Sequence, residues 1–138
     1  MNKTLLFGGS GFLGPIILEK YPDIVSVGRS PLLGHLKNTH VHLPSLDDPA
    51  ILDSLDFDNI IFLVGSSNHH IINTKPTMGL EYNVLPLKKI LFYLQKRTIK
   101  KFICFTTILL YDVNKMKLPV DETQPLNPYI NDYVFSKY

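Results

Sequence analysis

The sequence has little that could crosslink or anchor the chain. It contains a single cysteine, Cys104, so no disulfide can form within the chain, and the apolar neighbours of this residue predict a buried thiol with no nucleophilic role. No run of about 18 apolar residues is present, which is the length that a membrane-spanning helix requires. We therefore expect a cytoplasmic protein with no membrane partner.

Excess charge is also small. The formal net charge is +2, and 19% charged with 45% hydrophobic residues is the balance of an ordinary globular domain. The densest basic group follows a predicted helix, where cations interact favourably with the negative end of the helix dipole; it consists of Lys96, Arg97, Lys100 and Lys101. This pattern predicts no nucleic-acid partner.

Metal ligands are lacking as well. His40 and His42 alternate along a predicted strand, and His69 and His70 are adjacent, but no cysteine or carboxylate accompanies either pair at ligand spacing. We therefore predict no metal site.

Short apolar runs alternate with segments of helical spacing, which is typical of βαβ units. Strands are expected at residues 3–7, 24–27, 40–43, 59–64 and 101–110. Helices are expected from about residue 12, over 47–55 with Asp47 or Asp48 as cap, over 80–96, and from residue 133. The predicted fold class is α/β, a Rossmann-type doubly wound parallel sheet, forming one incomplete domain over residues 1–138 with no second domain.

Two helices have apolar residues at helical spacing. In the first they are Phe12, Leu13, Ile16, Ile17 and Tyr21. In the helix over 80–96 the expected buried stripe is Leu80, Val84, Leu87, Leu91 and Leu94.

A glycine-rich turn, Gly8-Gly9-Ser10-Gly11-Phe12-Leu13-Gly14, separates the first strand from the first helix. Gly8 permits a tight turn, Gly11 lets phosphates approach the backbone, and Gly14 lets the helix pack closely on the strand. In this strand–turn–helix context the spacing predicts a pyrophosphate site, with Phe12 and Leu13 as part of it.

Tyr133 and Lys137 are four residues apart, so a helix places both on one face. An ammonium beside a phenol favours the phenolate and lowers the pKa of the tyrosine toward working pH. Alone, this spacing is more typical of a solvated helix face. Here it follows Thr106-Thr107 in the second half of a predicted strand, which favours a catalytic role.

Four motifs in this order resemble the extended short-chain dehydrogenase/reductase family, in its branch of NAD-dependent epimerases and dehydratases that act on nucleotide sugars. They are the glycine turn, Glu81-Tyr82-Asn83-Val84, Thr106-Thr107-Ile108-Leu109-Leu110-Tyr111 and Tyr133-x-x-x-Lys137. The resemblance implies that Tyr133 is the acid/base and that Thr107 hydrogen-bonds the substrate oxygen. It implies that Lys137 tunes Tyr133 and binds the nicotinamide ribose, and that Asn83 has a structural or proton-relay role.

The cofactor type depends on the residues after the second strand. No acidic side chain is present there to hold the adenosine ribose, whereas Arg29 and Ser30 are groups that receive a phosphate, so NADP is favoured over NAD. The resemblance places Ser45 and Leu46 against the adenine, where the family commonly has Asp-Leu, and Gly65 beside the cofactor at the end of the fourth strand.

The resemblance covers about the first half of the family's length. It implies an NAD(P)-dependent reductase, epimerase or dehydratase whose later strands and substrate domain lie outside these residues. This chain would then supply mainly cofactor binding and be inactive alone, with the end of its last helix frayed or displaced. The alternative is a non-catalytic dinucleotide-binding or self-associating module, forming a homo-oligomer through the exposed edge of an open sheet.

Overall fold

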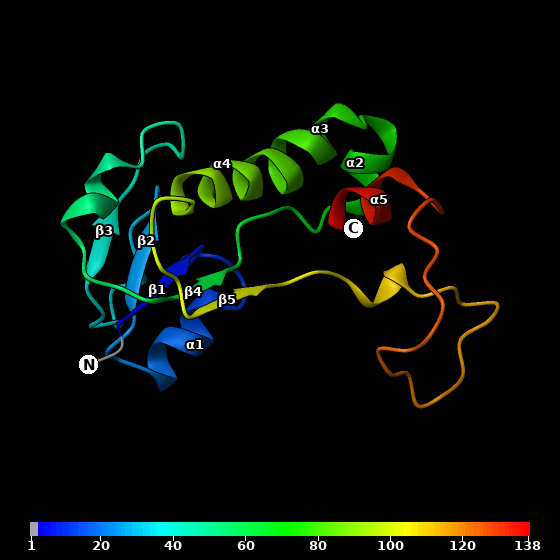
Figure 1. The fold of residues 1–138 in the computed structure, drawn as a ribbon, viewed down its shortest axis with the longest axis horizontal. Coiled ribbons are helices and arrows are strands. Elements are labelled where there is room, and N and C mark those ends of the chain that lie inside the picture. The colour runs from blue at the N-terminus through cyan, green and yellow to red at the C-terminus, as the bar shows by residue number, and fades with distance from the viewer. Residues whose placement is uncertain (1–2) are drawn as a thin grey trace. The chain divides into compact units, whose positions relative to one another are not determined.

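The computed structural model describes residues 3–138 (Figure 1). The strands are β1 (Thr4–Phe7), β2 (Val25–Gly28), β3 (His40–His42), β4 (Asn59–Phe62) and β5 (Lys101–Cys104). The α-helices are α1 (Gly14–Lys20), α2 (His69–Thr74), α3 (Thr77–Gly79), α4 (Leu85–Leu94) and α5 (Asp132–Lys137). Short helical turns of other types are η1 (Ala50–Ser54), η2 (Leu80–Val84, a π-helical turn) and η3 (Ile108–Leu110).

The chain forms two compact units. Unit 1 comprises the residues up to Val64 together with Pro86–Phe105, and it contains all five strands. Unit 2 comprises Gly65–Leu85 and Thr106–Tyr138.

The sheet of unit 1 is entirely parallel, with strand order β3-β2-β1-β4-β5. The chain builds outward from β1 to β3 and then crosses to the other side of β1, so the order reverses between β1 and β4. This is the doubly wound Rossmann arrangement, in which ligands bind outside the carboxyl ends of the strands at the point of reversal. The predicted fold class is therefore confirmed.

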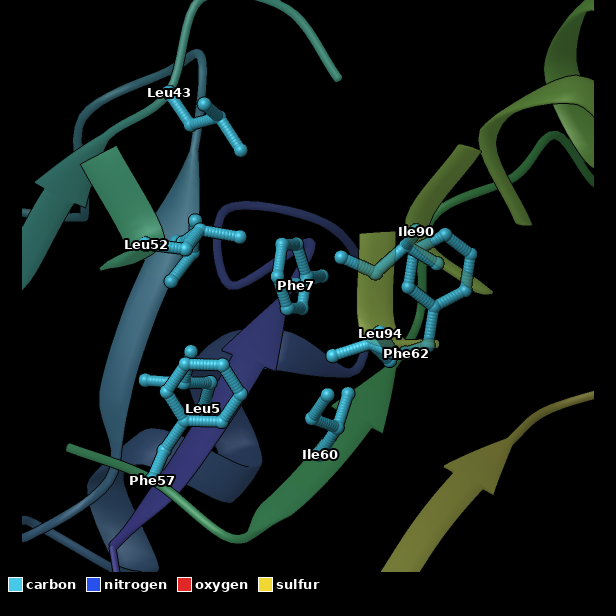
Figure 2. Packing of buried hydrophobic residues seen from close by; sticks show 10 residues of the cluster. Leu5, Phe7, Leu43, Leu52, Phe57, Ile60, Phe62, Ile90 and Leu94 are labelled. Carbon is cyan, nitrogen blue, oxygen red and sulfur yellow. The ribbon is translucent and has the colours of Figure 1, made fainter. Parts of the chain in front are cut away.

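Apolar side chains cover the inner strands on both faces. Figure 2 shows Leu5 and Phe7 of β1 converging with Ile60 and Phe62 of β4 on one face, under Ile90 of α4. The same cluster includes Leu43, Leu52, Phe57 and Leu94. On the other face, where α1 lies (Figure 1), Leu6 is fully buried. Burial on both faces explains why the last three residues of β1 and of β4 are all apolar.

The face of α1 that turns inward differs from the prediction. The buried residues of this helix are Gly14 and Leu18, which are four apart. Phe12 is 91% exposed and Ile16 is 61% exposed, and Leu13 and Tyr21 are also exposed. Gly14 decides the orientation, because only a residue without Cβ can lie against the turn, and the apolar residues flanking that face then point outward.

The stripe predicted for the helix over 80–96 is confirmed in part. Leu94 is buried and Leu87 packs against the core, as predicted, but Leu80, Val84 and Leu91 are exposed. The other buried positions are Asn83 and Ile90. The π-helical turn η2 shifts the positions of the side chains relative to those of a regular α-helix. Within this turn the buried residue is the polar Asn83, whereas sequence patterns assign buried positions to apolar residues.

Several boundaries also differ. β5 ends at Cys104 rather than near residue 110, because Thr107 caps η3, and the thiol of Cys104 is exposed. The expected helix over 47–55 is only the short turn η1, preceded by Pro49 without a side-chain cap. Residues 68–79, which show no sequence period, contain α2 and α3.

Unit 2 is held by a small core of its own. Ile72 of α2, Leu110 of η3, and Tyr133 and Val134 of α5 form a buried cluster. Residues 112–131 are a long loop, as predicted, with one antiparallel bridge between Tyr111 and Leu126. Among residues 3–138, no helix is both long and apolar enough to cross a membrane.

Candidate functional site

The glycine turn lies at the carboxyl end of β1, next to β4. Gly8 has φ +89°, a left-handed conformation that favours glycine, and its carbonyl accepts a hydrogen bond from the Gly11 amide at 3.0 Å. A Cβ on Gly14 would lie 2.5 Å from the carbonyl carbon of Gly9 and 2.6 Å from the carbonyl oxygen of Gly8. A Cβ on Gly11 would meet only the Gly8 oxygen, at 3.2 Å. Gly8 and Gly14 thus shape the turn, whereas Gly11 leaves space on its exposed side.

Gly9 has a structural requirement that sequence reasoning missed. A Cβ on this residue would collide with the hydroxyl of Ser26 and come within 3.0 Å of Leu18. Ser26 is buried in β2 and lies within 3.3 Å of the His40 ring nitrogen Nδ1. The turn therefore rests on a polar pair from β2 and β3. The spacing of the outer glycines carries no signal for this contact.

Arg29 and Ser30 directly follow β2, so they lie at the same sheet edge as the glycine turn. Both are exposed, and the position of a Cβ on Gly28 has no heavy atom within 4 Å. Arg29 and Ser30 are therefore exposed side chains at the edge where the glycine turn lies.

Ser45 and Leu46, expected against the adenine, follow β3 at the same edge. The Ser45 hydroxyl donates to Asp47 Oδ2 at 2.8 Å and accepts from the Asp47 amide at 3.1 Å, and Leu46 packs against the core. Hydrogen bonds from Lys89 and then from Ser45 hold the pKa of Asp47 below its ordinary value. The local turn thus already engages the Ser45 hydroxyl.

The remaining candidate residues belong to unit 2. Gly65, with φ +155°, faces two of them: a Cβ there would lie 2.8 Å from both Asn83 Oδ1 and Lys137 Nζ. Asn83 Oδ1 also accepts from the Ser66 amide at 2.7 Å. The structure therefore brings the predicted residues Gly65, Asn83 and Lys137 together.

Tyr133 begins the first turn of α5. Its amide donates to Asn73 Oδ1 at 2.9 Å, and its ring stacks on His69 with centroids 4.0 Å apart. The side chain is 5% exposed. Sequence analysis missed both His69 and Asn73, because the segment that carries them has no helical period.

Two adjacent threonines have different roles. Thr107 caps η3 because its hydroxyl oxygen accepts a hydrogen bond from the Leu109 amide at 3.3 Å. The hydrogen of this hydroxyl is not used in that bond. Thr106 Oγ1 donates to the Lys137 carbonyl at 2.6 Å, and the Tyr138 amide donates to the Val134 carbonyl at 3.2 Å. The expectation that the end of α5 is frayed is therefore wrong.

Comparison with known proteins finds no matching family model and no matching curated protein. Solved structures do match. The UDP-Glc/GlcNAc 4-epimerase from Campylobacter jejuni has a TM-score of 0.82 and 22% identity, over 99% of this chain and 46% of the epimerase. The UDP-glucose 4-epimerase from Brucella ovis, in complex with NAD, has a TM-score of 0.82 and 20% identity, over 99% of this chain and 45% of the epimerase. The L-threonine dehydrogenase from Clostridium difficile has a TM-score of 0.79 and 19% identity, over 99% of this chain and 46% of the dehydrogenase.

The chain thus spans less than half the length of these three solved chains. At such low identity, the similarity concerns the fold. The fold of this chain is similar to that of the Rossmann-like N-terminal part of these epimerases.

Proposed function

We propose that this chain is the dinucleotide-binding part of an NAD(P)-dependent enzyme of the extended short-chain dehydrogenase/reductase type that acts on a nucleotide sugar. The observation that carries the proposal is the glycine turn at the reversal point of a parallel sheet. There the backbone excludes a Cβ at Gly14, whereas Gly11 is exposed and only the Gly8 carbonyl oxygen lies within 4 Å of its Cβ position.

Backbone amides in such a turn are suited to the pyrophosphate of a dinucleotide, because no side chain intervenes between them and an anion. Gly11 is where the pyrophosphate approaches the backbone, and the exposed Phe12 and Leu13 follow it in the sequence. Arg29 supports NADP over NAD, since a guanidinium binds a 2′-phosphate through paired charge-assisted hydrogen bonds.

Unit 2 supplies the groups of the reaction. Tyr133 exchanges a proton with a hydroxyl or carbonyl oxygen of the substrate, and Thr107 hydrogen-bonds that oxygen. The ammonium of Lys137 hydrogen-bonds the nicotinamide ribose, as the family resemblance implies. The nicotinamide, when bound, supplies hydride transfer.

The substrate class rests on the resemblance and on the solved relatives, of which two are epimerases of UDP-sugars. L-Threonine dehydrogenase has a similar fold over 46% of its chain, so the fold alone does not choose the substrate. The choice of a nucleotide sugar therefore rests on the family resemblance and not on the fold.

Calorimetric titration with NADP, NADPH, NAD and NADH tests the proposal. Gly11→Val is the informative variant, because it fills the exposed side of the turn and its Cβ would meet only the Gly8 carbonyl oxygen, at 3.2 Å. Gly34→Val is its matched control, since Gly34 is an exposed glycine with no heavy atom within 4 Å of its Cβ position. Arg29→Ala tests the phosphate preference.

We expect the phosphorylated cofactors to bind more tightly than NAD, and Gly11→Val to abolish binding while Gly34→Val leaves it unchanged. Arg29→Ala should weaken NADP by about tenfold or more and leave NAD unaffected, as expected for loss of a charge-assisted contact. Absence of binding by all four cofactors would contradict the proposal.

A second candidate function is self-association. β5 pairs only with β4 among the described strands, and Ile103 and Phe105 at this edge are each 48% exposed. An open edge with exposed apolar side chains is a template for pairing with another chain. Size-exclusion chromatography with light scattering tests this candidate, and a monomer at all concentrations would count against it.

A further inference from the structure

The hydroxyl of Ser136 lies in a buried chain of hydrogen bonds within unit 2. It accepts from Asn83 Nδ2 at 2.8 Å and donates to the Tyr133 carbonyl at 2.8 Å. The same Asn83 side chain accepts from the Ser66 amide at 2.7 Å. Asn83 and Ser136 are only 7% and 9% exposed. A continuous polar link therefore joins Ser66 to the first turn of α5.

This link differs from the usual hydrogen bond of a serine in a helix. A serine commonly bonds a carbonyl of the preceding turn, as exposed Ser54 does with the Ile51 carbonyl at 2.8 Å. Ser136 makes the same local bond but also receives the amide of Asn83, a residue 53 positions away. Buried polar groups that each have a partner define one arrangement, because any shift leaves a donor or acceptor unpaired.

The backbone beside Ser136 has equally little freedom. A Cβ on Gly79 of α3 would lie 3.0 Å from Ser136 Cβ, so α3 and α5 approach closely at this point. The π-helical turn η2 follows Gly79 at once and carries Asn83. The close approach limits the distance between the two helices, and the hydrogen bond from Asn83 then fixes how α5 lies along its own axis.

Lys137 is the next residue along α5, so its place depends on that register. Its Nζ and Asn83 Oδ1 are each 2.8 Å from the Cβ position of Gly65. A rotation or slide of α5 would break the bond between Asn83 and Ser136 and would move the ammonium away from Gly65 at the same time.

We propose that Ser136 is a positioning residue that, through its bond to Asn83, holds Lys137 against Gly65 and so places its ammonium to bind the ribose on the nicotinamide side of the cofactor. This inference rests on the proposed function, because the ribose contact of Lys137 belongs to it. The Ser136 hydroxyl acts through the orientation of α5 and touches no reacting atom.

The test compares Ser136→Ala with Ser54→Ala, which removes the same local hydroxyl bond without a partner such as Asn83. The first readout needs no ligand: the nuclear Overhauser effect between Gly65 Hα and the Lys137 side chain by NMR. The second is calorimetric binding of NADP and of adenosine 2′,5′-bisphosphate, which lacks the nicotinamide ribose.

We expect Ser136→Ala to lose the Gly65–Lys137 signal and to bind NADP about fivefold more weakly, as for one hydrogen bond, with bisphosphate affinity unchanged. Ser54→Ala should match the unsubstituted chain in every readout. A retained signal in folded Ser136→Ala, or an equal loss of affinity for both ligands, would overturn the proposal. An unsubstituted chain that binds neither ligand contradicts the proposed function instead, and the NMR signal alone then decides the positioning role.

If Ser136→Ala does not fold, the unsubstituted chain still provides a test. The side-chain amide protons of Asn83 should then exchange with solvent at least tenfold more slowly than those of exposed Asn114. Equal exchange rates would show that the Asn83–Ser136 bond does not persist, which would overturn the proposal.

Discussion

Replacing Gly14 by alanine is the sharpest test of how the glycine turn is built. The added Cβ would lie 2.5 Å from the Gly9 carbonyl carbon, whereas ordinary van der Waals contact begins near 3.4 Å. The turn and the start of α1 must therefore separate by about 0.9 Å. The atoms that the added Cβ would meet are the carbonyl groups of Gly9 and Gly8, which belong to the backbone, so no side chain can rotate away to relieve the overlap.

Overpacking of this kind costs typically about 1–3 kcal/mol. Alanine recovers part of that cost through its better helix propensity, but Gly14 is the first residue of α1, where the gain is well below the full value of about 1 kcal/mol. We therefore expect the free energy of unfolding to fall by about 2 kcal/mol. For a chain of this size that lowers Tm by about 6–10 °C.

Thermal and urea unfolding measure this effect, with Gly34→Ala as control. Nothing lies within 4 Å of the Cβ position at Gly34, and its φ is not in the left-handed region. Alanine there restricts the unfolded chain and should be neutral or stabilising by up to about 1 kcal/mol. Equal stabilities for the two variants would refute the reasoning that α1 packs directly on the turn.

Three further predictions concern the stability of unit 1. Arg97→Ala should lower the free energy of unfolding by about 2–3 kcal/mol, because the guanidinium donates to the Leu52 carbonyl at 2.9 Å and stacks 4.7 Å above the Phe57 ring; an unchanged urea midpoint would contradict this. Leu18→Ala should cost about 2–5 kcal/mol in the same assay, since the side chain is fully buried, and a loss below about 1 kcal/mol would show that α1 is loosely packed. Burial, and to a smaller extent the charge of His42, lowers the pKa of His40 below its ordinary value of 6.5. As pH falls, the unfolded chain therefore binds the proton before the folded chain does. The free energy of unfolding then decreases as pH drops from 6.5 toward the lower pKa of the folded state. His40→Gln should flatten the dependence of Tm on pH between about 7 and 5, and an unaltered slope would exclude His40 as its source.

The sheet was predictable because its signal is local. Each inner strand is a short apolar run next to a turn, and burial on both faces requires that composition whatever the rest of the fold does. The glycine turn was equally predictable. Gly8 has a positive φ that favours glycine, and Gly14 lies too close to the backbone of the turn to carry a Cβ. Strand order then follows from the preference for short crossover connections.

The faces of the helices were not predictable from apolar spacing. In α1 the inward face is set by Gly14, a residue that hydrophobicity patterns ignore, so Ile16 was assigned to the wrong side. In the longer helix, Asn83 takes a buried place because two partners satisfy its amide. Those partners lie 17 and 53 residues away, and no local pattern reveals them.

Arg97 shows the same limit for charge. The sequence predicts a cation that stabilises a helix end, but the side chain instead reaches the carbonyls of Leu52 and Leu55 at the end of η1. A guanidinium with several donors can satisfy distant backbone acceptors, and that role depends on tertiary position rather than on neighbours in sequence.

The candidate groups of the two units are placed by different means. In unit 1 the glycine turn is made of backbone, and the requirement is that side chains be absent at Gly8, Gly9 and Gly14. In unit 2 the candidate groups are mainly side chains, and in our proposal Asn83 and Ser136 hold Lys137 in place. A backbone site is lost when a Cβ is added, whereas a side-chain site is lost when a polar group is removed. Because these failures are chemically opposite, adding a Cβ in unit 1 and removing a polar group in unit 2 test the glycine turn and the Asn83–Ser136 hydrogen bond separately.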